Sequence, residues 1–230
     1  MSKLRVRIAK ALVWIFAGVV LVPIALVLLY RFVSPPITPL MLIRGGNVAY
    51  QWVPMTRIAP VLARSVLTAE DENFCQHHGF DKAALQKALD QYLDEDEEAT
   101  LRGGSTISQQ TAKNVFLWPD RTWIRKGLET GFTLYIEAMW PKQRIMEVYL
   151  NVVEWAPGVY GAEAAARHHF KKSAAALSAH EAAALAAVLP NPRKWNASNP
   201  GPYVQGRTTT LQGRAARVGA LANCLQNPKP

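Results

Sequence analysis

Apolar residues recur at a helical period along most of the chain. In residues 57–69 they stand at positions 58, 61, 62, 66 and 69, a spacing typical of one helix face. Similar spacing predicts helices over residues 82–93, 106–116, 122–139 and 142–151. Alternating apolar and polar positions, which predict strands, are nearly absent. The pattern therefore predicts a mainly α-helical domain.

Single residues mark the beginnings of two helices. Ser178 and Glu181 form a capping-box sequence ahead of an alanine-rich helix. Ser105 follows a glycine pair and is expected to be the N-cap of the helix over 106–116, which would leave backbone N–H groups pointing outward.

The N-terminal stretch has a different pattern. Residues 11–30 have no ionisable side chain before Tyr30, and about 20 residues at 1.5 Å each span a hydrocarbon core of about 30 Å. Four cations precede the stretch and only Arg31 follows it before the SPPITP segment, so the positive-inside rule places the N-terminus in the cytoplasm. A removed signal peptide is the alternative, but the run is too long for one and no small-residue cleavage site follows it.

These features divide the chain into five predicted parts. They are a cytoplasmic tail (1–10), a transmembrane helix (11–31), a proline- and glycine-rich connector (32–56), an exported helical domain (57–222) and a tail (223–230).

Charge and cysteine content add limited information. The net charge of +9 favours an anionic partner such as a lipid phosphate or a membrane surface. Nucleic acid is poorly supported, because the domain is predicted to lie outside the cytoplasm. Cys75 and Cys224 are the only cysteines. They are far apart in the sequence and define no disulfide framework, so the sequence favours leaving them unpaired.

Glu70 is the first candidate for chemistry. It lies in the stretch AEDENFCQHHGFD, directly after the helix predicted over 57–69. The electronegative end of that helix and the charge of Asp71 both disfavour ionisation of Glu70, which would raise its pKa towards that of a general base. A solvated carboxylate pair at a helix end is the alternative, and this stretch alone favours that interpretation.

The stretch RGGSTISQQTAKNVFL supplies a polar stripe. Thr106, Gln109, Gln110 and Lys113 follow one another at helical spacing after the glycine pair. Such a stripe is either the wet face of a helix or one wall of a sugar-phosphate cleft, and both interpretations remain open.

A second carboxylate lies on the helix predicted over 122–139. Arg125 and Glu129 are four residues apart and share a helix face. They form either an exposed ion pair or a carboxylate held among cations that stabilise a leaving phosphate. Glycosyl chemistry often uses two such carboxyl groups. No metal-binding, P-loop, serine-hydrolase or transpeptidase motif occurs, and adjacent histidines on a helix diverge too far to clamp a metal.

Six stretches in order resemble a known family. They are EDENFCQHHG, GGSTISQQTAKNVFL, RKGLE, RIMEVYLN, GVYGAEAAARHHF and EAAALAAVLPNP. Together they resemble the peptidoglycan glycosyltransferase family, family 51 of the glycosyltransferases, and most closely its monofunctional members. The resemblance implies a lysozyme-like, two-lobed helical fold with one membrane helix. It also implies polymerisation of lipid II, with β-1,4 bonds formed by inversion and undecaprenyl pyrophosphate released.

The resemblance also implies roles for particular residues. Glu70 matches the general base and Glu129 the second essential glutamate. The substrate-binding positions are Asp71, Ser105, Thr106, Gln109, Gln110, Lys113, Asn114, Arg125 and Lys126. The remaining motif positions, partly structural, are Phe74, His77, Gly79, Gly103, Gly104, Tyr149 and Asn151.

The resemblance extends to cofactors, partners and location. A divalent cation, Mg²⁺ or Mn²⁺, at the pyrophosphate is reported for the family, but no metal ligand set is recognisable here. The implied partners are lipid II, a lipid-linked glycan chain, the membrane, and proteins of cell-wall synthesis or division. The implied location is the bacterial inner membrane, crossed once, with the catalytic domain in the periplasm.

Two other functions are weaker candidates. A membrane-anchored lytic enzyme would cut the same glycan with a general acid but would need no pyrophosphate site, so the cations Lys113, Arg125 and Lys126 favour synthesis. A non-catalytic binding protein of the envelope would have no reason to keep both Glu70 and Glu129.

Overall fold

The computed structural model describes residues 3–86, 90, 104–120, 122–220 and 222–226, with the backbone alone for most of residues 3–19 and for residues 220 and 226. Gly103, residues 87–89 and 91–93 of the helix predicted over 82–93, and residues 227–230 of the predicted C-terminal tail lie outside the described residues.

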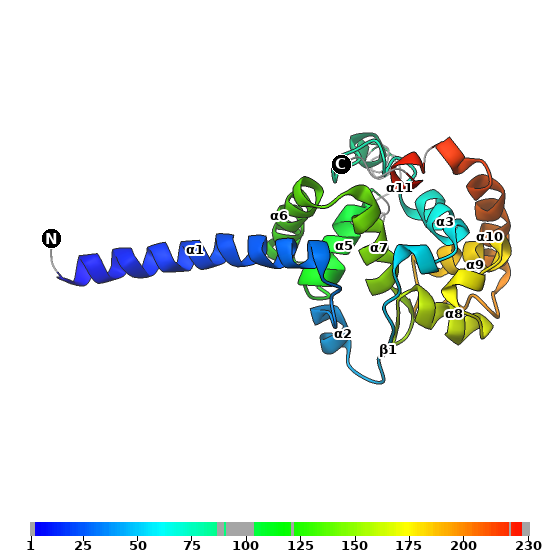
Figure 1. Ribbon diagram of the computed structural model, residues 1–230, viewed down its shortest axis with the longest axis horizontal. Coiled ribbons are helices and arrows are strands. Elements are labelled where there is room, and N and C mark those ends of the chain that lie inside the picture. The colour runs from blue at the N-terminus through cyan, green and yellow to red at the C-terminus, as the bar shows by residue number, and fades with distance from the viewer. Residues whose placement is uncertain (1–2, 87–89, 91–103, 121, 221, 227–230) are drawn as a thin grey trace.

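The described residues are mainly helical, as predicted. The helices are α1 (Lys3–Phe32), α2 (Pro39–Arg44), α3 (Pro60–Glu70), α5 (Ile107–Phe116), α6 (Trp123–Met139), α7 (Lys142–Val152), α8 (Ala162–Phe170), α9 (Ala179–Val188), α10 (Pro202–Ala215) and α11 (Asn223–Gln226), with short 3-10 turns at Met55–Arg57, Ala174–Ala176 and Val218–Ala220. Three short strands, β1 (Ala49–Tyr50), β2 (Glu154–Ala156) and β3 (Val159–Tyr160), form a sheet in the order β1-β3-β2, with β1 parallel to β3. Figure 1 shows α1 projecting from the cluster formed by the other helices.

One predicted helix cap is confirmed and another is wrong. Ser178 and Glu181 form the predicted capping box of α9. The N-cap of α5, however, is Thr106 rather than Ser105. A capping box needs a carboxyl or amide side chain three residues after the cap. Thr106 has Gln109 at that distance, whereas Ser105 has only Ser108.

The alanine-rich helix α9 is buried over most of its length. Its side chains from Ala182 to Val188 are all buried, and it packs against both α3 and α10. A helix that is apolar on all sides belongs in a core. Small side chains let neighbouring helices approach closely, so α9 fixes the position of α3, which ends at Glu70.

The segment predicted as a connector, residues 32–56, contributes α2 and β1 to this fold. The side chain of Asn151 holds the segment in place. Its Oδ1 accepts a hydrogen bond from Val53 N at 3.0 Å, and its Nδ2 donates to Val53 O at 2.9 Å. Asn151 is completely buried, so its role is structural.

The C-terminal end of α1 is docked on the domain. Trp140 Nε1 donates to Val27 O at 2.8 Å, and Arg144 donates to Tyr30 O at 2.9 Å. Within the part of the chain that the structure describes, no helix has the length and apolar character needed to cross a membrane. The side chains of residues 11–13, 15, 16 and 19 in the predicted span, residues 11–31, lie outside that part.

Cys75 and Cys224 form a disulfide, which corrects the expectation that they are unpaired. Their Cα atoms are 5.6 Å apart although 149 positions separate them in the sequence. Sequence could not show this proximity, because it results from tertiary packing, in which α11, the helix of Cys224, packs against α7. The bond ties the loop after Glu70 to the C-terminal region.

We predict that this disulfide contributes to stability. Reduction of the full-length protein in detergent should lower its free energy of unfolding by about 2–4 kcal/mol, because the crosslink closes a long loop in the unfolded chain. Denaturant titrations with and without reductant measure the change. The Cys75→Ser/Cys224→Ser variant is the matched control, and it should unfold like the reduced wild type in both conditions. Equal stability of oxidised and reduced wild type would contradict the prediction.

Candidate active site

Glu70 is the last residue of α3 and is half-buried. Its Oε2 accepts a hydrogen bond from Gln110 Nε2 on α5 at 2.8 Å. Gln110 Oε1 in turn accepts from the hydroxyl of Tyr149 on α7 at 3.2 Å. Tyr149 is completely buried, so this chain of contacts fixes one side of the Glu70 carboxylate.

The surroundings raise the pKa of Glu70 above its ordinary value, in the predicted direction. Burial is the main cause. The Gln110 hydrogen bond and the charges of Arg207 and Lys113 oppose it, and repulsion from Asp71 is the smallest contribution named. The sequence argument relied on the electronegative helix end and on Asp71, whereas burial has the larger effect.

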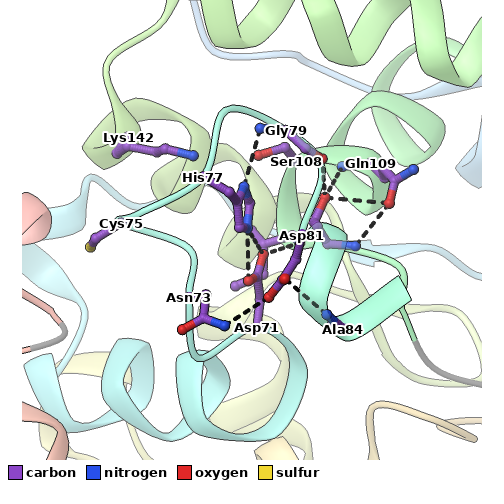
Figure 2. A network of polar contacts seen from close by, with 12 residues as sticks. Asp71, Asn73, Cys75, His77, Gly79, Asp81, Ala84, Ser108, Gln109 and Lys142 are labelled. Carbon is purple, nitrogen blue, oxygen red and sulfur yellow. Dashed lines mark hydrogen bonds and ion pairs between the residues drawn. The ribbon is translucent and has the colours of Figure 1, made fainter. Parts of the chain in front are cut away.

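Asp71 joins the end of α3 to the start of α5. Its Oδ2 accepts from the backbone N–H of Ile107 at 2.9 Å, and its Oδ1 lies 2.9 Å from His77 Nε2 (Figure 2). His77 Nδ1 accepts from Gly79 N at 3.1 Å, so the contacts assign the proton of a neutral imidazole to Nε2. Both oxygens of Asp71 are therefore used inside the protein, which indicates a positioning role.

The other motif residues in this loop are structural as well. Gly79 has φ +92°, and a Cβ atom there would lie 2.8 Å from Thr133 Cγ2. Thr106 donates from its hydroxyl to Gly79 O at 2.7 Å. Phe74 is completely buried, with the ammonium of Lys142 4.4 Å from the centre of its ring. These contacts hold the loop from Asp71 onward against α5 and α6.

Glu129 lies in the interior rather than on an exposed helix face. It is 3% exposed, and its carboxylate pairs with Arg125 at 2.5 Å and with Lys126. Arg125 is itself 7% exposed. Because a buried carboxylate is costly without partners, the three residues act as one unit. Of the two interpretations left open by the sequence, the exposed ion pair is wrong.

Two cavities flank these residues. The first, which we call the cationic cavity, has a volume of about 500 Å³, and its lining includes Gln110, Lys113, Asn114 and Arg125. The second, the Glu70 cavity, has a volume of about 490 Å³, and its lining includes Glu70, Asp71, Gly104, Ser105 and Thr106. Gln110 lines the first cavity and is hydrogen-bonded to Glu70, which lines the second.

Lys113 links the two sites electrostatically. Burial lowers its pKa most, while the negative charge of Glu129 acts in the opposite direction. Lys113 also favours the ionised form of Glu70. Its charge therefore acts on both carboxylates.

The structure thus divides the predicted site residues into three groups. The residues that line the two cavities are named above. Glu129 pairs with Arg125, which lines the cationic cavity, and with Lys126; neither Glu129 nor Lys126 is among the described residues that line it. The residues with internal contacts are Phe74, His77, Gly79, Gln109, Tyr149 and Asn151.

Sequence reasoning missed four residues near the cavities. Arg44 and Glu154 line the cationic cavity, Arg214 lines the Glu70 cavity, and Arg207 donates to Ala69 O at 3.5 Å. Arg44 lies in the segment predicted as a connector, and no spacing pattern connects it with Glu154. Among the residues that the structure describes, no three His, Cys, Asp or Glu side chains are grouped to hold a metal ion.

The chain is similar in sequence to known proteins over most of its length. A family model described as Transglycosylase matches residues 40–216. The biosynthetic peptidoglycan transglycosylase of Rhodospirillum centenum is 51% identical to the chain, over 96% of this chain and 97% of that protein. Proteins of the same name from Caulobacter vibrioides and Stutzerimonas stutzeri are 51% and 46% identical, over 92% and 100% of this chain and 93% and 96% of theirs.

We predict that Asp71 and His77 stabilise the fold as a coupled pair. Asp71→Ala should lower the free energy of unfolding by about 1–3 kcal/mol, because Ile107 N–H and His77 lose their acceptor. In a double-mutant cycle with His77→Ala, denaturant titration should give a coupling energy of at least about 0.5 kcal/mol. Glu72→Ala serves as the neighbouring control and should cost less. Additive single effects would show that the two side chains do not interact.

Proposed function

The chain belongs to the transglycosylase family and is a peptidoglycan glycosyltransferase, and we propose that it polymerises lipid II with Glu70 as the general base. The observation that supports this assignment is the position of Glu70. It is a half-buried carboxylate of raised pKa, hydrogen-bonded to a residue that lines a cation-rich cavity. A base for a hydroxyl group and cations for a leaving phosphate thus lie on either side of one glutamine.

In the proposed reaction, the acceptor lipid II places the 4-hydroxyl of its terminal sugar in the Glu70 cavity. Glu70 takes the hydroxyl proton while the oxygen attacks the anomeric carbon of the lipid-linked glycan. The new C–O bond forms on the face opposite the pyrophosphate, so the configuration inverts to β-1,4. The bond between the anomeric carbon and the phosphate oxygen breaks, and its electron pair leaves with undecaprenyl pyrophosphate.

The leaving group is assigned to the cationic cavity. Lys113 and Arg125 line it and carry the charges that favour a departing pyrophosphate. Glu129 acts through Arg125, whose guanidinium it holds from the next turn of α6. A divalent cation at the pyrophosphate stays a prediction. Because the described residues offer no cluster of ligands for it, no step is assigned to a metal here.

Peptidoglycan synthesis takes place at the cell envelope, and we place the chain at the inner membrane with its catalytic domain in the periplasm. The sequence of residues 11–31 supports a single membrane helix. Next to α1, helix α6 exposes Trp123, Ile124 and Leu128, apolar side chains suited to a lipid surface. The disulfide also suits an oxidising compartment. A lysozyme-like, two-lobed arrangement and contacts with other cell-wall proteins belong to the same proposal.

We predict that Glu70→Gln abolishes glycan synthesis while the protein stays folded. Gln is nearly isosteric with Glu but cannot accept the hydroxyl proton, so the rate of lipid II polymerisation should fall by a factor of at least about 10². Gel analysis of glycan strands from purified lipid II measures the rate, and thermal unfolding checks the fold. Glu181→Gln, which keeps the capping box of α9, should retain activity. Near-normal strand growth by the Glu70 variant would refute the assignment.

The pH profile offers a second test. A general base must be ionised, so kcat/KM should rise with pH through the raised pKa of Glu70. The hydrogen bond from Gln110 lowers that pKa, and Gln110→Met should therefore shift the acid limb to higher pH. Arg207→Gln should shift it in the same direction, because the positive charge of Arg207 also lowers the pKa. A limb that stays in place in both variants would mean that another group controls it.

A further inference from the structure

Arg44 lines the cationic cavity, and the proposed reaction assigns no role to this cation. It is the last residue of the short helix α2 and lines the same cavity as Lys113 and Arg125. Its side chain is 29% exposed, so part of the guanidinium is accessible from solvent. The cavity therefore receives positive charge from α2, α5 and α6.

Glu154 holds this guanidinium in place. The carboxylate lies at the start of β2, is 4% exposed, and pairs with NH1 of Arg44. Its other oxygen accepts from Gly158 N at 3.2 Å and lies 3.7 Å from Arg193 NH1. Since backbone and sheet fix Glu154, the position of the Arg44 guanidinium is fixed as well.

The pairing leaves donors for a ligand. A guanidinium has five N–H groups in a planar fork, and Glu154 contacts NH1. Arg44 and Lys113 are also close enough for their charges to repel, and Arg44 contributes, after burial and Arg125, to the lowered pKa of Lys113. An anion between them would relieve this repulsion.

We propose that Arg44 is a third cation that binds the pyrophosphate of the lipid-linked donor and that Glu154 is its positioning residue. The inference rests on the proposed function, because it assigns the leaving group to the cationic cavity. A pyrophosphate presents several oxygens around two phosphorus atoms, and the planar fork of an arginine suits two of them at once. In the competing explanation, Arg44 and Glu154 form a structural ion pair that fixes α2 on the sheet.

Three variants separate these explanations. Arg44→Gln removes the cation but leaves Glu154 buried with a weaker partner, which can destabilise the fold. The Arg44→Gln/Glu154→Gln variant removes both charges and avoids that cost. Arg193→Gln is the matched control, because Arg193 also contacts Glu154 but is not among the described residues that line the cavity.

The test measures binding of farnesyl pyrophosphate to the full-length protein in detergent by calorimetry, with farnesol as the uncharged control. Arg44→Gln and the double variant should both bind farnesyl pyrophosphate about tenfold more weakly than wild type, a loss of about 1.4 kcal/mol. Farnesol binding should be unchanged in all variants, and Arg193→Gln should match wild type. Competition with lipid II in the polymerisation assay assigns the binding to the donor site.

Two results would overturn the proposal. The first is wild-type affinity for farnesyl pyrophosphate in both Arg44 variants. The second is an equal loss in Arg193→Gln, which would show only a general effect of charge. If wild type itself fails to bind farnesyl pyrophosphate, the assignment of the leaving group to the cationic cavity fails too. Retained binding by wild type with no effect of Arg44 overturns this inference alone.

Discussion

The rest of the site depends on the two contacts that the carboxylate of Asp71 makes. It accepts the backbone N–H of Ile107 and pairs with His77, so the end of α3 is fixed to the start of α5. Glu70 is the neighbouring residue on α3, and Gln110 lies one helical turn into α5. Once Asp71 sets the distance between the helix ends, the hydrogen bond from Gln110 to Glu70 follows. An anion at the N-terminus of α5 is also favoured by the helix dipole.

The protein buries two carboxylates together with cationic partners. Glu129 is held by Arg125 and Lys126, and Glu154 by Arg44 with Arg193 nearby. In both cases the carboxylate is the more buried member, while an arginine reaches the cavity. A buried carboxylate cannot stay ionised without partners, so it fixes the arginine more firmly than surface contacts would. The cavity thus gains cations whose positions are set before any ligand arrives.

Local patterns predicted several of the helices, and the order of six motifs selected Glu70 and Glu129 as candidates, because periodicity and motif order are properties of short stretches. The N-cap of α5 was misplaced by one residue, since Ser105 and Thr106 differ only in what stands three residues later. The disulfide and the pair of Arg44 with Glu154 could not be predicted, because each joins segments that only tertiary packing brings together. The raised pKa of Glu70 was predicted in direction, but its main cause, burial, is likewise a property of the packed fold.

Under the proposed function, the electrostatics of the two cavities couple donor binding to base strength. Lys113 lowers the pKa of Glu70, and Glu129 favours the charged form of Lys113. A pyrophosphate beside Lys113 would offset part of the positive charge that Glu70 experiences. The pKa of Glu70 would then rise further, and a carboxylate of higher pKa binds the hydroxyl proton more strongly. The glutamate would thus be a weaker base in the empty enzyme and a stronger one once the donor is in place.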